Sequence, residues 1–106
     1  MKQMDVKTRP FDAVNYLETE EDIAAYLDVA LNDDDPRMLY IALGNIARAR
    51  GMTEVARKAG VSRESMYRSL SADGNPSADT LLKIVSALGI RLHARPVADT
   101  HAAIAI

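Results

Sequence analysis

Five amphipathic stretches, each bounded by residues that start or end helices, fill the chain between residues 19 and 89. Within each stretch, apolar side chains recur three and four positions apart, which places them on one face of a helix. The predicted helices span about residues 20–32, 36–50, 54–59, 63–70 and 77–89. Helices this short are stable when their apolar faces pack on one another, so we expect an all-α domain of five helices.

Polar residues at the boundaries supply the expected helix caps. A side-chain oxygen at the cap position accepts a hydrogen bond from a free backbone N–H of the first turn. The predicted caps are Thr19 (in a capping box with Asp22), Asp35 (followed by Pro36), Thr53, Ser62 and Ser77. The first and last helices are expected to bury Ile23, Leu27, Ala30, Leu31, Leu81, Leu82, Val85 and Leu88.

Residues 90–97 show a different periodicity, because apolar Ile90, Leu92 and Ala94 alternate with polar side chains. This period is typical of a half-buried strand, so we predict a short C-terminal β-strand. A single strand leaves its backbone donors and acceptors unpaired. Pairing with the same strand of a second chain would make a dimer with these three residues at the contact; the alternative is that the strand lies along the N-terminal arm.

Composition limits the classes of protein that the chain can belong to. Its 106 residues suit one compact domain, and the absence of cysteine excludes disulfides, thiolate metal sites and cysteine nucleophiles. No apolar run approaches the roughly 18 residues of a membrane span, and the N-terminus lacks the apolar stretch of a secretory signal. We therefore expect a cytoplasmic protein.

The net charge of -2 hides a division of charge along the chain. Residues 1–36 hold ten acids and three bases, a balance of -7, whereas residues 37–70 hold seven bases and two acids, a balance of +5. The middle third is therefore the candidate surface for a polyanion such as DNA.

The segment 53–70 has the residue types of a helix-turn-helix. Ala56 is small where two helices would pack closely, Gly60 allows the left-handed turn, and Val55, Val61 and Met66 would fill the wedge between the helices. The second helix would then present polar side chains that can contact base edges and phosphates. The predicted DNA-binding residues are Thr53, Arg57, Lys58, Ser62, Arg63, Glu64, Ser65, Tyr67 and Arg68. Among these, we expect Arg63 and Ser65 to contact bases and Arg57, Lys58 and Ser62 to contact phosphates.

Other constellations favour simpler interpretations. His93 and His101 are the two histidines and have no acid at ligand spacing, so no metal site is predicted. The acids around residue 20 suit a helix N-terminus for electrostatic reasons and do not indicate catalysis. No cofactor is expected. A basic helix face can also be merely solvated, and an interaction module without DNA binding would keep the same fold.

Several pieces of the chain together resemble a known family. They are residues 11–17 (FDAVNYL), 23–27 (IAAYL), 42–52 (ALGNIARARGM), 60–68 (GVSRESMYR), 74–76 (GNP) and 87–92 (ALGIRL). Residues 36–92 resemble Xre/Cro-type, lambda-repressor-like domains, and residues 11–92 are similar to the probable addiction-module antidote family of HigA-like antitoxins. One departure is Ser69, which stands where Xre proteins usually bury an aliphatic residue, and we expect Leu70 to fill that place.

The resemblance implies a repressor that binds its own operator and neutralises a RelE/ParE-type toxin. The division of charge, rather than the resemblance, suggests an acidic N-terminal extension over residues 1–35, which a helix-turn-helix domain over 36–97 and a tail over 98–106 would follow. The acidic first third would meet the toxin, with Phe11, Tyr16, Glu20, Glu21 and Asp22 as candidates. The alternatives are a stand-alone transcriptional regulator without a toxin and a first third that merely covers the domain's own core.

Overall fold

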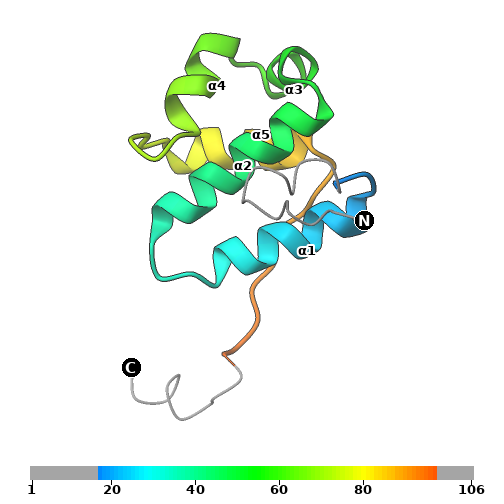
Figure 1. Cartoon of the computed structure of the whole chain (residues 1–106), viewed down its shortest axis with the longest axis vertical. Coiled ribbons are helices and arrows are strands. Elements are labelled where there is room, and N and C mark those ends of the chain that lie inside the picture. Colours follow the sequence, from blue (N-terminus) through cyan, green and yellow to red (C-terminus); the bar gives the residue numbers. More distant parts are fainter. Residues whose placement is uncertain (1–16, 98–106) are drawn as a thin grey trace, which may run out of the picture.

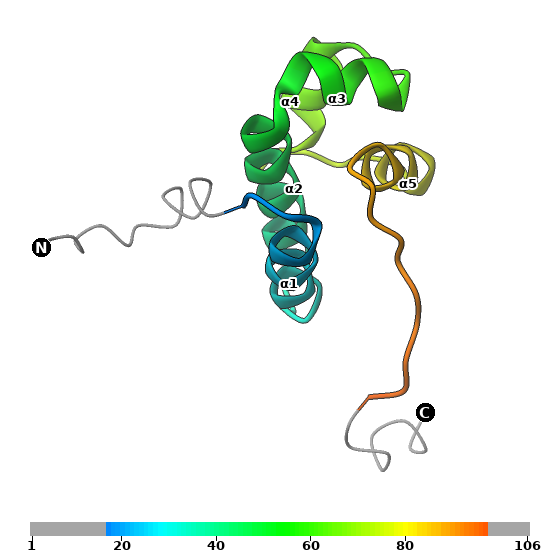
Figure 2. The same ribbon diagram turned by 90° about the vertical axis from the view of Figure 1, so that its right-hand side faces the viewer.

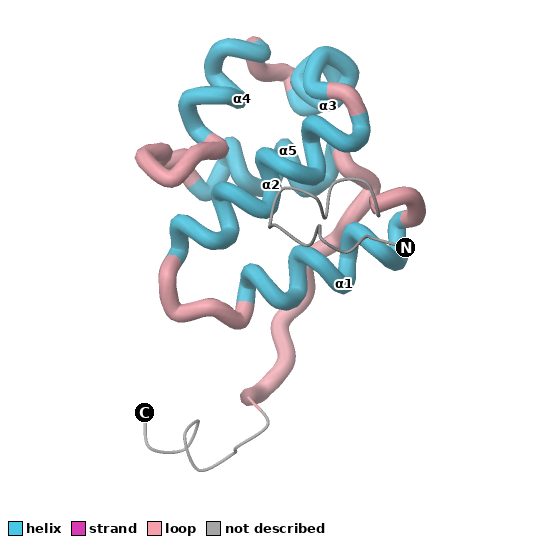
Figure 3. Tube along the Cα trace, viewed as in Figure 1, coloured by secondary structure: helices cyan, strands magenta, loops and turns pink. Residues whose placement is uncertain are grey.

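The computed structural model describes residues 17–97, and in that range it contains five helices and no strand (Figure 1, Figure 3). The helices are α1 (Glu20–Leu31), α2 (Pro36–Arg50), α3 (Met52–Ala59), α4 (Arg63–Ser69) and α5 (Ala78–Ala87). The predicted all-α class and the number of helices are therefore confirmed for this part of the chain.

Side-chain caps begin four of the helices as predicted. At α1, the Asp22 backbone N–H donates to Thr19 Oγ1 at 3.0 Å while the Thr19 backbone N–H donates to Asp22 Oδ2 at 3.3 Å. The Arg37 backbone N–H donates to Asp35 Oδ1 at the start of α2. Ser62 and Ser77 cap α4 and α5. Each cap satisfies a backbone donor that the first helical turn leaves free.

The start of α3 corrects one prediction. This helix begins at Met52 rather than Glu54, and Thr53 is an exposed helical residue instead of the cap. The residue before the helix is Gly51, with φ of 102°, a left-handed conformation that glycine adopts without a Cβ clash. Because the chain turns at Gly51, directly after α2, Met52 lies in the first turn of α3 and is buried in the core.

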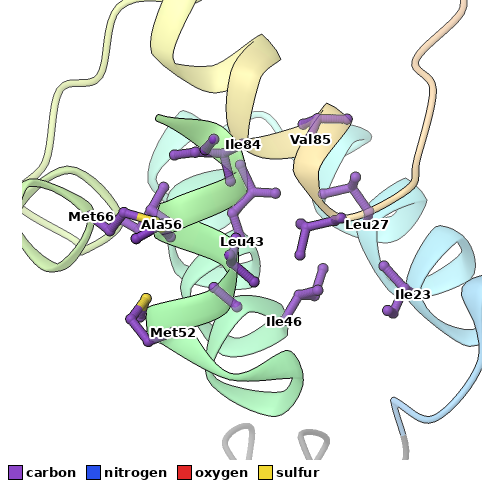
Figure 4. Packing of buried hydrophobic residues seen from close by; sticks show 14 of the residues in the cluster. Ile23, Leu27, Leu43, Ile46, Met52, Ala56, Met66, Ile84 and Val85 are labelled. Carbon is purple, nitrogen blue, oxygen red and sulfur yellow. The ribbon is translucent and has the colours of Figure 1, made fainter. Parts of the chain in front are cut away.

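One apolar core joins all five helices, and α2 runs through its middle. Leu43 and Ile46 of α2, Met66 of α4 and Ile84 of α5 are fully buried within it (Figure 4). The core also takes in Leu17, Ile23 and Leu27, so α1 packs on the same core as the other four helices. Residues on both sides of position 35 therefore share one apolar interior.

Two residues predicted to be in the core lie at the surface instead. Leu82 is 57% exposed and Leu31 is 43% exposed. In α5 the buried residues are Ile84, Val85 and the capping Leu88, with Leu81 half-buried at the edge. These positions follow the i, i+3, i+4, i+7 spacing from residue 81, and Leu82 lies one residue off this stripe.

The helices form layers around α2. In two perpendicular views, α1 lies on one side of α2, and the α3–α4 pair lies on the other (Figure 1, Figure 2). Helix α5 packs on α3. The acidic first helix and the basic fourth helix are thus separated by α2.

The predicted strand at residues 90–97 is not formed. This segment continues from α5 past α1 without regular structure, and residues 91–97 are all exposed (Figure 2). A strand exists only as part of a hydrogen-bonded ladder, and no other extended segment runs beside it within residues 17–97. Period-two patterning therefore signalled an extended backbone here, but not a sheet.

Candidate nucleic-acid interface

The connection between α3 and α4 is a tight turn of three residues, Gly60–Ser62. Gly60 has φ of 75°, in the left-handed region, and the Val61 backbone N–H donates to the Ala56 carbonyl at 3.0 Å. Ser62 Oγ then accepts from the Ser65 backbone N–H at 3.0 Å. The first bond closes the end of α3 and the second opens α4, so the turn sets the angle between the two helices.

Apolar side chains fill the space inside this turn. Val55, Ala56 and Met66 are buried, and Val61 is half-buried against the core. Leu70 is also buried, whereas Ser69 is half-buried, so Leu70 fills the place expected of it at the end of α4. Packing on one side of α4 turns its opposite side toward solvent.

The polar residues of α4 lie on that outer side. Arg63, Glu64, Tyr67 and Arg68 are exposed, as is the capping Ser62, while Ser65 is half-buried. Tyr67 is 44% exposed, so its polar hydroxyl and part of its apolar body are accessible on this side of α4. Two cations and an aromatic side chain on one exposed helix are suited to hydrogen bonds and apolar contacts with base edges.

Tyr67 and Arg63 contact each other across one turn of α4. Arg63 Nη2 donates to the Tyr67 hydroxyl at 3.1 Å, and the guanidinium carbon lies 5.6 Å from the ring centroid. The guanidinium therefore rests near the hydroxyl end of the ring and is held by a neutral group.

The cations of α3 have different surroundings. Arg57 is exposed and forms an ion pair with Glu54 one turn earlier, and this partner holds the pKa of the Glu54 carboxyl below its usual range. Lys58 is exposed on another flank, where it lines a groove of about 220 Å³ with Glu20 of α1 and Arg50 of α2. Arg57 would have to exchange a carboxylate for a phosphate on binding DNA, and Lys58 sits beside α1 and the end of α5.

The predicted acidic surface is partly engaged within the chain. Glu20 Oε2 lies 3.4 Å from Arg50 Nη2, and Asp22 is used in the capping box of α1. Glu21 is exposed. Phe11 and Tyr16, the aromatic candidates, lie outside the described residues. Of the three acids, Glu21 keeps its carboxylate clear of these local contacts.

Two of the candidate dimer residues, Ile90 and Leu92, line a second groove, of about 320 Å³, between α1 and residues 90–95. Ile90 is half-buried, Leu92 is 39% exposed and Ala94 is exposed. The alanines of α1 line the opposite wall with Leu27 and Leu31. Apolar side chains remain accessible along this edge of the molecule.

Sequence reasoning missed two neighbouring residues of α2 that position the other helices. A Cβ on Gly44 would lie 2.7 Å from the Leu70 carbonyl oxygen, so this glycine permits the close approach of α4's end. Asn45 is buried, and its Nδ2 donates to the Tyr26 hydroxyl at 2.9 Å. A glycine in the middle of a helical stretch was the available signal for the first, since it costs about 1 kcal/mol relative to alanine unless packing requires it.

Two other kinds of site were sought in the described part of the chain. Between Leu17 and Val97, no cluster of three or more His, Asp or Glu side chains could hold a metal ion. No helix in that range is long and apolar enough to cross a membrane.

The fold and this surface together define a small all-α protein with an exposed basic helix on one side of its central helix and an acidic helix on the other. Residues 7–96 match the model of the family described as probable addiction module antidote protein. The chain belongs to this family, as its resemblance had indicated.

The chain is also similar to a curated protein. An uncharacterized protein of Haemophilus influenzae is 42% identical over 88 residues, which cover 83% of this chain and 91% of the relative. No solved structure was found to match the chain.

Proposed function

We propose that the protein is the antitoxin of a toxin–antitoxin module and represses its own operon through a helix-turn-helix of the Xre/Cro type formed by α3 and α4. The family description, an addiction module antidote, supports the first half of this proposal. The exposed face of α4 supports the second half and is the observation on which it depends. A cytoplasmic protein that acts on chromosomal DNA is the corresponding expectation.

In this proposal α4 enters the major groove. Arg63 and Ser65 contact base edges, Glu64 and Arg68 extend the contact along the same helix, and Tyr67 belongs to this surface through its hydrogen bond with Arg63. Ser62, Thr53 and Arg57 contact phosphates beside the groove. Lys58 lines the groove that α3 shares with Glu20 of α1, so its phosphate contact is expected to be weaker than that of Arg57.

Salt titration of DNA binding tests this half of the proposal. A duplex carrying the sequence upstream of the reading frame is titrated between 50 and 200 mM salt, because each phosphate contact releases counterions and steepens the dependence. Arg63→Ala is expected to weaken operator binding by roughly 1 to 3 kcal/mol and to relax base preference. Arg57→Ala is expected to weaken operator and random DNA alike and to flatten the salt slope. Equal losses on both DNAs for Arg63→Ala would remove it from the base-reading set.

In the first half of the proposal, the antitoxin role, we assign toxin binding to the first third of the chain. Residues 17–36 carry eight acids and no Lys or Arg, and helix α1 lies on the opposite side of α2 from α4. A RelE/ParE-type toxin, basic by family resemblance, would be steered electrostatically to such a surface. Phe11 and Tyr16, with Glu20, Glu21 and Asp22, are the proposed contacts.

Co-expression with the product of the adjacent reading frame, followed by pull-down, tests this half. The double variant Glu21→Gln/Asp28→Asn removes two exposed charges from α1 and is expected to slow association and to lower its salt sensitivity. Asp73→Asn removes an exposed charge from the loop after α4 and serves as the control. Unchanged capture by the double variant would place the toxin elsewhere on the helical body.

The principal alternative is a stand-alone Xre-family regulator, which would use the same DNA face without a toxin. A genome in which no small basic protein is encoded beside this chain would favour it.

We also propose a homodimer, because one α3–α4 pair covers a short half-site and such repressors pair two units across a twofold axis. Ile90, Leu92 and Ala94 are the proposed contact, and truncation after Gly89 should leave a monomer by sedimentation.

A further inference from the structure

Several cations of the described chain are held by carboxylates. Arg37, Arg50, Arg57 and Lys83 each pair with a carboxylate. Arg63, by contrast, forms no ion pair with a carboxylate of residues 17–97 and donates instead to the Tyr67 hydroxyl. A hydroxyl orients a guanidinium without neutralising it, so Arg63 keeps its full charge for an external acceptor.

The contact leaves Arg63 free to bind a second group. A guanidinium carries five N–H donors in a planar fork, and the Tyr67 hydroxyl accepts one of them, on Nη2. Guanine needs two donors, for O6 and N7, in the bidentate contact that arginine makes in the major groove. The remaining donors can supply these while the contact with Tyr67 persists.

Holding Arg63 in advance also removes a cost of binding. A free, exposed arginine samples many rotamers, which a base contact must restrict. A neighbour one helical turn away on the same face restricts them beforehand, since residues four apart lie side by side on a helix. The ring of Tyr67 adds a cation–π contact at 5.6 Å to the hydrogen bond.

We propose that Tyr67 is a positioning residue for base recognition: its hydroxyl presets the Arg63 guanidinium to read one guanine of the DNA site. This inference rests on the proposed function, in which α4 enters the major groove. It separates the roles of two residues that share one surface, because Arg63 touches the base and Tyr67 acts through Arg63.

A double-mutant cycle on Arg63→Ala and Tyr67→Phe tests the assignment. The DNA site is first selected from a random-sequence duplex pool with the wild-type protein, and each base pair of the site is then varied at constant salt. Arg63→Ala is expected to lose about 5- to 150-fold in affinity and its preference at one G·C pair. Tyr67→Phe keeps the ring and is expected to lose about threefold to tenfold, at the same pair. The double variant should bind no worse than Arg63→Ala.

A second readout separates positioning from a general loss of affinity. Tyr67→Phe should leave the salt dependence unchanged, because no phosphate contact is removed, and should increase the mobility of the Arg63 side chain in the DNA-free protein by ¹⁵N relaxation of Nε. Tyr26→Phe removes a hydroxyl from α1, outside the α3–α4 pair, and should leave base preference intact.

The possible failures are distinguishable. Additive losses in the double variant, or a loss for Tyr67→Phe spread evenly over all base pairs, would show that Tyr67 contacts DNA independently of Arg63 and would overturn the inference alone. If the wild-type protein selects no sequence from the pool, the proposed DNA-binding function is wrong and the inference falls with it.

Discussion

The side-chain amide of Asn45 donates a hydrogen bond to the Tyr26 hydroxyl, 2.9 Å away, and so ties α2 to α1. On its other side, Asn45 Oδ1 accepts from Arg48 Nη1 at 3.1 Å. Asn45 is the buried polar residue of the core, with 8% of its surface exposed. Both ends of its amide are thus satisfied within the described chain, as a buried polar group requires.

Loss of the Tyr26 hydroxyl is expected to destabilise the fold. Tyr26→Phe leaves the buried Asn45 donor without its partner, which should lower the free energy of unfolding by about 1 to 3 kcal/mol. Urea denaturation followed by circular dichroism measures it. Tyr67→Phe, which removes a hydroxyl from an exposed pair, is the matched control and should change stability by less than about 0.5 kcal/mol. Equal losses for both variants would contradict a structural role for the Tyr26–Asn45 bond.

Two serine caps offer a comparison between stability and function. Ser62 and Ser77 accept from backbone N–H groups at 3.0 Å and 3.1 Å, so alanine at either position should cost about 1 kcal/mol. Thermal unfolding should therefore report similar losses for both variants. Only Ser62→Ala should also weaken DNA binding, because Ser62 begins α4 whereas Ser77 begins α5. A DNA-binding loss of equal size in Ser77→Ala would point to a purely global effect.

Gly44→Ala tests the close approach of α2 and the end of α4. Alanine should gain about 1 kcal/mol in helix propensity at this position. The added Cβ would lie 2.7 Å from the Leu70 carbonyl oxygen, which belongs to the backbone and cannot rotate away. Overpacking of this kind costs typically 1 to 3 kcal/mol, so we expect net destabilisation in denaturant titration. A more stable variant would show that the two helices separate easily.

The Glu54–Arg57 pair predicts a pKa change that NMR titration can follow. Arg57 lowers the pKa of Glu54 by a side-chain hydrogen bond, so Arg57→Gln should raise it toward its ordinary value of 4.5. A carboxyl with a lowered pKa stabilises the fold above its unfolded value and loses this contribution as the pH falls through its folded value. The pair is fully exposed, so its effect on stability should be slight and should weaken with salt. An unshifted Glu54 titration in the variant would contradict the pairing.

Local signals predicted the elements whose ends are set by neighbours in sequence. The capping box of Thr19 and Asp22 and the left-handed Gly60 need only residues three or four positions away, so they could be recognised without a structure. The helix cap predicted at Thr53 was wrong. Helix α3 begins earlier, directly after Gly51, and its first turn has no side-chain cap.

Tertiary relationships were not readable in this way. The exposure of Leu82 depends on which face of α5 packs on α3. The apolar residues at positions 81, 82, 84 and 85 leave more than one face of the helix apolar enough for this contact. A strand at residues 90–97 needs a partner that no pattern within the segment supplies. The contacts of Gly44 with Leu70 and of Asn45 with Tyr26 join positions 26 and 19 residues apart, so the sequence does not name the partner of either residue, even where a glycine inside a helix indicates a close contact.

The position of α2 between α1 and α4 limits how ligands on the two surfaces could influence each other. Two successive helix-to-helix spacings amount to about 16 to 20 Å, roughly twice the screening length of about 8 Å in physiological salt. A polyanion against α4 and a cationic protein against α1 would therefore contact opposite sides of α2 and come nearest to each other at the groove that Lys58 shares with Glu20. In the proposed function, the chain would be the middle layer of a three-part stack, and this groove is the place where one outer layer could affect the other.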